Sequence, residues 1–119
     1  MSKNTTSNIK NLLSDLEELI ISALRNGEEL YGLEITKKIE SKTEGEIKIG
    51  FGSLYPALRR LESKKFVEAR WGEDLPEERE GARRRYYKVT AEGLNAYQRK
   101  RSIFKKDIHP ETSEGLPNV

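Results

Sequence analysis

The sequence of 119 residues lacks cysteine and has a single histidine, methionine and tryptophan. Without cysteine there is no disulfide framework and no thiol chemistry, which fits a reducing cytoplasm without proving one. The one histidine, His109, precedes a proline and has no second ligand at a useful spacing, so no metal site is expected. With no Ser-His-Asp set and no phosphate-binding loop, catalysis would need an unusual pair of carboxylates. We therefore expect neither enzyme activity nor a cofactor.

Long hydrophobic runs are also missing. The N-terminal stretch MSKNTTSNIK is polar, without an apolar signal core, and no run approaches the length of a membrane span. We therefore expect a soluble, cytoplasmic protein with no membrane partner. Apolar residues make up 34% and charged residues 35% of the chain, which allows one thin core. A domain of this kind often buries further surface in a dimer.

The net charge of +2 conceals blocks of opposite sign. Residues 47–72 carry six Lys/Arg and two Asp/Glu, and residues 81–106 carry nine and one. Between them, residues 73–80 (EDLPEERE) carry one and five. Two basic blocks around an acidic insert suggest an anionic partner, nucleic acid first, while the alternative is a set of solvated surface faces.

Apolar residues with helical period predict two helices in the first part of the chain. The stripe of the first helix ends at Asn26-Gly27 and is wide enough to bury on two sides. Its members are Ile9, Leu12, Leu13, Leu16, Leu19, Ile20, Ala23 and Leu24. The second helix follows in LYGLEITKKIESK, residues 30–42, where Gly32 is expected to permit close helix packing. The alternation in Glu46–Ile49 suggests a short strand.

A third helix is expected in GFGSLYPALRRLE, beginning at Gly50 or Gly52. Pro56 then lies in its first or second turn, where few amides have an intrahelical partner to lose. The apolar stripe of the helix turns inward, and Tyr55 lies on its flank. A compact helix that presents arginine and hydroxyl groups suits a DNA major groove. The residues expected to face outward are Ser53, Pro56, Arg59, Arg60 and Ser63.

The roles of these outward residues are open at this point. Arg59 and Arg60 either contact bases or phosphates, or serve solubility; the architecture favours DNA, but not which arginine reads bases. Tyr55 either reaches a phosphate with its hydroxyl group or packs its ring at the helix edge. Ser53 either meets DNA or helps the helix to start.

Two alternating stretches, FVEARW and RRRYYKV, predict a β-hairpin around the polar residues 72–82. Strand alternation places Arg85 on the inner side, which leaves Arg83 and Arg84 as the better candidates for DNA contact. Helices followed by this hairpin describe a winged helix-turn-helix, a fold that is mainly α with a small β-hairpin. The aromatic residues expected in the core are Tyr31, Trp71 and Tyr87.

Thr90 with Glu92 resembles a helix start, and a fourth helix is expected over residues 91–108. His109-Pro110 is expected to end it, which leaves residues 109–119 as a flexible tail. The expected domains are therefore a DNA-binding domain (1–90), a C-terminal dimerisation helix (91–108) and this tail.

The fourth helix carries a stripe with the spacing of a coiled-coil seam, which predicts a homodimer. Arg101 is expected at the edge of the seam or paired with an acid from the other subunit's first helix, such as Asp15, Glu17 or Glu18, because an unpaired buried charge is costly. The alternative is a monomer whose fourth helix folds back on its own domain. The expected dimerisation residues are Leu94, Tyr97, Arg101, Phe104 and Ile108, with Leu12 and Leu16 from the first helix.

Three stretches resemble the PadR family of bacterial transcriptional regulators: LEELIISALRNGEELYGLEI, GSLYPALRRLESKKFVEARWG and GARRRYYKVTAEG. The LYPALRRLE and RRRYYKVT blocks and their separation make this resemblance specific. It implies a winged-helix repressor that dimerises through its C-terminal helix, with the third helix in the major groove and the hairpin at the minor groove or backbone. The chain is similar to short members with one C-terminal helix, and to cyanobacterial members, one of which adjusts circadian period.

The hairpin loop departs from the short, Gly-rich loop usual in this family. Its acidic residues, from Glu73 to Glu80, either splay away from DNA or lower the affinity. Some members enclose aromatic ligands between aromatic residues of two C-terminal helices. Phe104 lies near that position, but Arg101 and Lys105 surround it, so a small-molecule effector is left open and is not indicated.

Together these patterns predict a sequence-specific repressor that binds double-stranded DNA as a homodimer on an inverted-repeat operator. The alternative is a winged-helix module that docks a protein partner and has little DNA affinity, against which the basic third helix and the hairpin arginines argue. The residues expected at DNA are Ser53, Tyr55, Pro56, Arg59, Arg60, Arg83 and Arg84.

Overall fold

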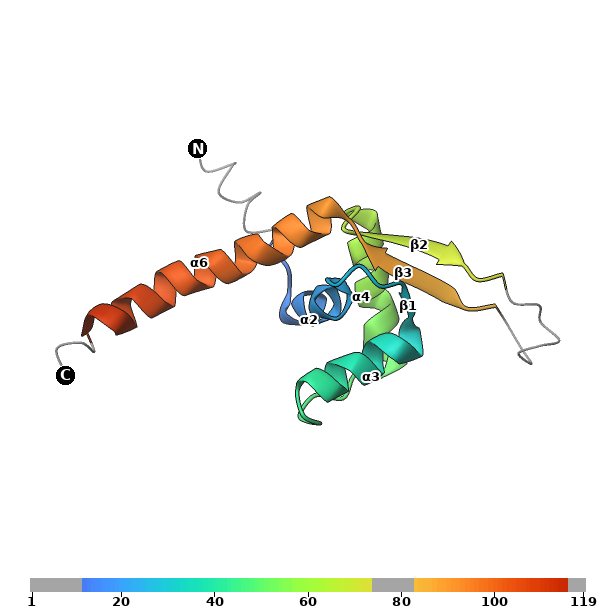
Figure 1. The fold of residues 1–119 in the computed structure, drawn as a ribbon, viewed down its shortest axis with the longest axis horizontal. Coiled ribbons are helices and arrows are strands. Elements are labelled where there is room, and N and C mark those ends of the chain that lie inside the picture. The colour runs from blue at the N-terminus through green and yellow to red at the C-terminus, as the bar shows by residue number, and fades with distance from the viewer. Residues whose placement is uncertain (1–11, 74–82, 116–119) are drawn as a thin grey trace.

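The computed structural model describes residues 12–73 and 83–115, with side chains as far as Phe104. Three helices pack around one end of a small sheet, and a fourth helix extends away from them in the direction opposite to strands β2 (Val67–Trp71) and β3 (Arg85–Val89) (Figure 1). None of the helices in this described part is both long and apolar enough to span a membrane. In chain order the elements are α2 (Asp15–Leu24), β1 (Leu30–Tyr31), α3 (Gly32–Lys42), α4 (Phe51–Ser63), β2 (Val67–Trp71), β3 (Arg85–Val89) and α6 (Ala91–Gly115).

Helix α2 begins later than its apolar stripe suggests. Ser14 and Glu17 form a capping box, in which Glu17 N donates to Ser14 Oγ at 3.1 Å and Ser14 N donates to Glu17 Oε1 at 2.8 Å. Leu12 and Leu13 therefore precede α2, although they were expected within the first helix, and Ile9 lies outside the described residues. Leu13 is nevertheless buried, so the apolar pattern marks packing rather than helix.

The three-stranded antiparallel sheet has the order β1-β3-β2. The hairpin is as expected, with Val67 opposite Val89 and Trp71 opposite Arg85. The third strand is Leu30–Tyr31, paired with Tyr87 and Tyr86 on the free edge of β3, and not the expected Glu46–Ile49, which forms no strand. A two-residue strand is too short to show alternation in the sequence. Pairing with β3, and not a local pattern, makes these two residues a strand.

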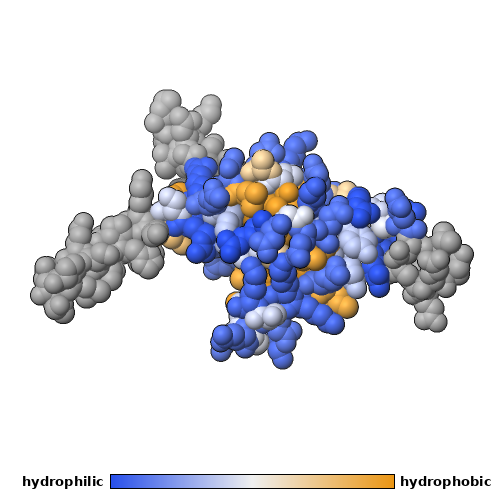
Figure 2. Space-filling view, viewed as in Figure 1, coloured by the Kyte–Doolittle hydropathy of each residue, from blue (hydrophilic) through white to orange (hydrophobic). Residues whose placement is uncertain are grey.

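One aliphatic cluster holds α2, α3, α4 and the sheet together. The inward stripe of α4 (Leu54, Ala57, Leu58 and Leu61) is fully buried in it, as expected. Charged and polar residues cover most of the remaining surface, and hydrophobic residues show mainly near the middle of the face seen in Figure 2. The fully buried aliphatic side chains are Ile20, Ile21, Leu24, Ile35, Ile39, Leu54, Leu58 and Leu61.

Helix α6 starts where Thr90 caps it and packs its first turns on α2. Gly93 N donates to Thr90 Oγ1 at 3.0 Å, while Thr90 Oγ1 donates to the Lys65 carbonyl at 2.8 Å. The expected helix start is therefore confirmed. The expected end is wrong, because α6 continues through His109-Pro110 to Gly115. Proline removes one backbone hydrogen bond and often kinks a helix without ending it, so residues 109–115 are helix and not a tail; residues 116–119 lie outside the described part.

Lys65 holds a left-handed backbone conformation at the end of α4, with φ of 64°. Phe66 N donates to the Leu61 carbonyl at 2.9 Å and Lys65 N to the Glu62 carbonyl at 3.0 Å, which is the Schellman pattern usually built on glycine. A side chain costs about 1–2 kcal/mol in this region.

We expect Lys65→Gly to stabilise the protein by about 0.5–1 kcal/mol, since relief of this strain exceeds the greater freedom of glycine in the unfolded chain. Urea denaturation measures the difference. Lys65→Ala is the matched control, because it removes the same charge and keeps the strained Cβ. If the alanine variant gains as much stability as the glycine variant, the effect comes from the lysine side chain and not from the backbone.

Candidate nucleic-acid interface

Helix α4 presents a polar face away from the core, bounded by Pro56. The helix begins after Gly50, so Pro56 falls in its second turn, as expected. The carbonyl that its ring crowds belongs to Gly52, which has no heavy atom within 4 Å of a Cβ placed on it. The residues exposed on this face are Gly52, Ser53, Arg59, Arg60 and Ser63, and Pro56 is half-buried among them.

Tyr55 packs its ring at the edge of α4 against the start of α3. A Cβ on Gly32 would overlap the Tyr55 hydroxyl and lie 2.8 Å from its Cζ atom, so the ring fits because residue 32 has no side chain. Gly32 therefore permits the expected close packing. The Tyr55 ring also lies 5.6 Å from the Phe51 ring, centroid to centroid. Of the two interpretations of Tyr55, the structure contains the packing; phosphate contact stays a prediction.

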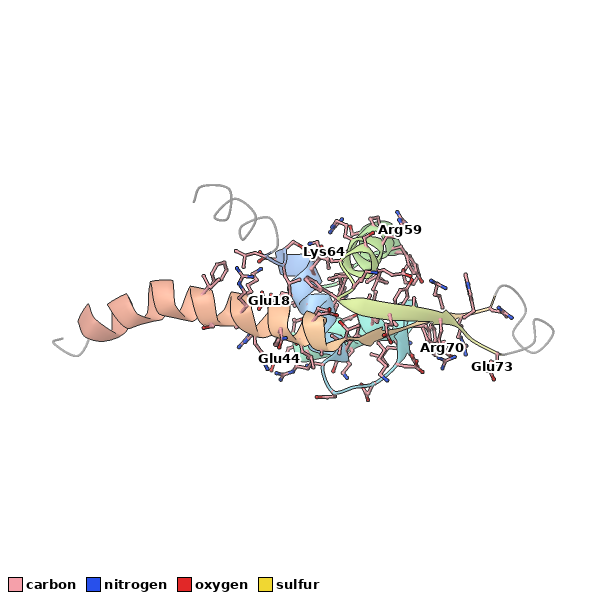
Figure 3. The ribbon with its side chains drawn as sticks, turned by 90° about the horizontal axis from the view of Figure 1, so that it is seen from above. Glu18, Glu44, Arg59, Lys64, Arg70 and Glu73 are labelled. Carbon is pink, nitrogen blue, oxygen red and sulfur yellow. The ribbon has the colours of Figure 1, made fainter. Side chains whose placement is uncertain are left out.

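The two arginines of α4 differ in their surroundings. Arg59 is exposed and makes no side-chain hydrogen bond or ion pair with the residues that the structure describes. Arg60 Nε instead donates to Glu17 Oε2 of α2 at 3.1 Å, although 51% of the Arg60 side chain is exposed. Figure 3 shows Arg59 on the side of α4 away from α2, and Lys64 on the side towards it. Among the described residues Arg59 thus has no ion-pair partner on the outward face, whereas Arg60 is paired with α2.

Glu17 was expected only as a possible partner of Arg101 from another subunit, whereas the structure pairs it with Arg60 and Lys64 of α4 in its own chain. Its side chain is only 2% exposed, and Lys64 Nζ lies 3.4 Å from both carboxylate oxygens. Burial alone would raise the pKa of Glu17, but the Ser14 amide, Lys64 and Arg60 together lower it below the usual value of 4.5. The sequence SDLE, residues 14–17, predicts a capping box, but no local pattern predicts that the Glu17 carboxylate also pairs with α4.

Because this pKa is lower in the folded state, Glu17 stabilises the protein at neutral pH and loses that contribution as the pH falls from about 4.5 through the folded pKa. We expect the difference in unfolding free energy between the wild type and Glu17→Gln to be largest above pH 6 and to shrink below pH 4. Chemical denaturation at a series of pH values measures it. A difference that is constant across this range would show that the charge of Glu17 contributes nothing to stability.

The arginines of the hairpin differ in the residues that they contact. Arg85 Nη2 lies 3.1 Å from Glu62 Oε2 of α4, so Arg85 faces inward as strand alternation predicts. Arg84 stacks on the Tyr31 ring at 4.5 Å, and Arg83 is exposed. Arg70 of β2 pairs with Glu29, with Nη2 at 2.7 Å from Oε1. Arg83 and Arg84 are the hairpin arginines nearest to the loop; Arg83 is exposed, and Arg84 is half-buried against Tyr31.

Trp71 is not in the core as expected, since 52% of it is exposed. It lies at the end of β2, and the Arg85 guanidinium carbon lies 4.9 Å from the centre of its ring. Tyr87 is buried and Tyr31 half-buried, so the expectation holds for Tyr87. Trp71 lines an open groove of about 540 Å³ between the loop-side end of the hairpin and the first turns of α3 and α4, together with Tyr31, Gly32, Leu33, Phe51, Tyr55, Tyr87 and the arginines 83–85.

Of the expected dimerisation residues, Leu94 and Tyr97 pack against the core of their own domain. Tyr97 is only 6% exposed, and Leu94 is half-buried against the same cluster. Arg101 pairs with Glu18 of its own α2 at 3.6 Å, so no second subunit is needed to supply the acid. Leu12 and Leu16 are half-buried, and Phe104 is 46% exposed. The Ile108 side chain lies outside the described residues.

Other expectations also fall outside the described part. They include the acidic loop beyond Glu73 and the His109 side chain. Glu73 belongs to the described part and is exposed. Within the described ranges no three His, Cys, Asp or Glu residues gather as metal ligands would.

The order of the helices and the hairpin, with β1 completing the sheet, defines a winged helix-turn-helix. The chain belongs to the transcriptional regulator PadR-like family, whose sequence profile matches residues 20–99. A transcriptional regulator from Clostridium thermocellum is 30% identical, over 85% of this chain and 88% of its own, with a TM-score of 0.66.

Two further relatives are less informative about function. Uncharacterized protein X of Lysinibacillus sphaericus is 35% identical over 63 residues, 53% of this chain and 54% of its own length, so the match spans about half of that relative. Bacillus subtilis PadR, solved in complex with operator DNA, is 22% identical over 72% of this chain and 46% of its own. Its TM-score of 0.61 shows a common fold alone.

Proposed function

We propose that this protein is a cytoplasmic, sequence-specific DNA-binding regulator that represses transcription by occupying a promoter and performs no catalysis. The observation that carries the proposal is the outward face of α4, where Arg59 is exposed and unpaired among the described residues, beside Ser53 and Ser63. An arginine free to form two hydrogen bonds is the commonest reader of guanine in the major groove. The operator complex of B. subtilis PadR supports the same use of the fold.

In this proposal Arg59 reads bases, and the cations around it fix the position of the protein on the phosphate backbone. Arg60 lies on the flank of α4, and Arg83 lies at the loop end of the hairpin, where a duplex in contact with α4 would pass. Arg84 joins this group with its guanidinium stacked on Tyr31.

The distal part of α6 supports a homodimer. The C-terminal part of α6 extends away from the other helices (Figure 1), and Phe104 is exposed, with Lys100 Nζ at 5.5 Å from its ring centre. A second copy would cover this surface, and a two-fold axis would place two α4 helices about 34 Å apart on an inverted-repeat operator.

The proposal is tested by binding of the full chain to random-sequence duplex DNA over a range of salt concentrations, followed by genome-wide immunoprecipitation. Affinity should fall steeply with salt, by a slope of about −0.9 for each phosphate neutralised. Absence of DNA affinity at low salt, or of discrete sites in the genome, would overturn it. Such a result would favour a protein-docking module.

Arg59 and Arg83 should respond differently to removal. We expect Arg59→Ala to weaken binding to an enriched site by about 1–3 kcal/mol and binding to random duplex much less. Arg83→Ala should weaken both about equally and make the salt slope shallower by about 0.9. Competition measurements with the two duplexes separate these outcomes. Equal losses on both duplexes for Arg59→Ala would mean that Arg59 contacts phosphate and reads no base.

A further inference from the structure

The first turn of α2 carries three acids that face two different helices. Asp15 and Glu18 pair with Lys100 of α6, at 2.9 and 3.3 Å. Glu17 faces the other way and pairs with Arg60 and Lys64 of α4. Glu17 has no role in the DNA contact proposed above, although its buried carboxylate lies against α4, the helix that would contact DNA.

The geometry of this cluster fixes which atoms remain available. Glu17 Oε1 accepts from the Ser14 amide at 2.8 Å, and Oε2 accepts from Arg60 Nε at 3.1 Å. Lys64 Nζ lies 3.4 Å from both oxygens. Because Nε is the nitrogen nearest to the Arg60 side-chain stem, this bond holds the stem and leaves the outer end of the half-exposed guanidinium to solvent.

One buried carboxylate therefore competes with phosphate for two cations. Arg60 Nε has a single N–H group, so it cannot donate to a phosphate oxygen unless its contact with Glu17 breaks. The Lys64 ammonium group has three N–H groups, but the nearby carboxylate neutralises its charge and holds it against α2, where only 29% of its side chain is exposed. Glu17 therefore gives Arg60 one fixed direction and weakens the attraction of Lys64 to phosphate.

We propose that Glu17 is a positioning residue that aims Arg60 and withholds Lys64 from phosphate, and so lowers affinity for DNA in general relative to the operator. The proposal rests on the DNA-binding function proposed above. It makes Glu17, which touches no DNA, a determinant of discrimination between operator and other sequences.

Glu17→Gln is the direct test, with the affinity of the full chain for random-sequence duplex as the readout. Glutamine at this position still completes the capping box, so α2 should start normally. We expect the salt slope to become steeper by about 0.9, since Lys64 neutralises one more phosphate, and affinity at low salt to rise about tenfold. The ratio of affinities for an enriched site and for random duplex should fall. Loss of structure alone would lower both affinities and would not steepen the slope.

Glu18→Gln is the matched control. It removes the same charge from the same helical turn, but its carboxylate faces Lys100 and Arg101 of α6 and not α4. We expect its salt slope to equal that of the wild type. A steeper slope in both variants would mean that net charge, and not the contact with α4, sets the affinity, which would overturn the proposal.

Lys64→Gln tests the same idea with Glu17 intact, so the outcome does not depend on the folding of the Glu17 variant. If Glu17 withholds Lys64, this change leaves the salt slope as in the wild type. A slope shallower by about 0.9 would show Lys64 on phosphate and overturn the proposal. An unchanged slope in Glu17→Gln, with DNA binding by the wild type intact, would overturn it and leave the proposed function standing. Absence of DNA affinity in the wild type would overturn both this proposal and the proposed function.

Discussion

Gly93→Ala should destabilise the protein by about 3 kcal/mol, because overpacking against a backbone atom cannot be relieved by a side-chain rotation. A Cβ at Gly93 would overlap the Phe66 carbonyl oxygen and lie 2.9 Å from Val89 Cγ2. The same carbonyl accepts from Thr90 N at 3.0 Å, so it cannot move without breaking the junction between α6 and the sheet. Urea denaturation followed by circular dichroism measures the loss.

Gly52→Ala is the control for this prediction. Gly52 also lies in a helix, but a Cβ there has no heavy atom within 4 Å. Alanine should stabilise α4 by up to about 1 kcal/mol, through helix propensity alone. If Gly93→Ala behaves like Gly52→Ala, the contact between α6 and Phe66 is not tight in solution.

Phe104→Asp should convert the proposed dimer into a monomer, with a dissociation constant raised about 100-fold or roughly 3 kcal/mol, because an unpaired carboxylate would replace an aromatic anchor in the interface. Truncation at Gly93 is a poor test of the dimer, since it also removes Tyr97 and Lys100 from the core of the domain. Substitution at Phe104 leaves both residues in place. Sedimentation equilibrium gives the dissociation constant.

Ser102→Asp provides the comparison for Phe104→Asp. Ser102 is exposed, and helical geometry places it about 200° around α6 from Phe104. The charge change is the same on the opposite face, so this variant should remain a dimer. Dimers in both variants would place the interface elsewhere on the molecule.

Much of the fold could be predicted because its information is local. The buried stripe from Leu54 to Leu61 and the alternation in the hairpin follow from helix and strand periods, and Arg85 faces inward for the same reason. The start of α2, β1 and the end of α6 were not predicted correctly. The Ser14 capping box, and not the apolar period, sets the start of α2. Pairing with the edge of β3 makes β1 a strand, and α6 continues past Pro110 although proline commonly ends a helix.

The candidate site could be predicted only in part. Residue type and helical phase identify the outward face of α4, including Arg59 and Arg60. They do not separate the two arginines, because what separates them is Glu17, 43 residues away in the sequence. Likewise Trp71 looks like a core residue by type, but in the structure it is the last residue of β2 and 52% of it is exposed.

The contact between Asp15 and Lys100 joins residues 85 apart in a chain of 119. Tyr97, from the same turns of α6, completes the core around α2. Helix α2 therefore has no complete surface to pack on until α6 has been synthesised. Closing so long a loop is slow compared with forming the local helices. Docking of α6 on α2 is accordingly expected to be the last step in the folding of this domain.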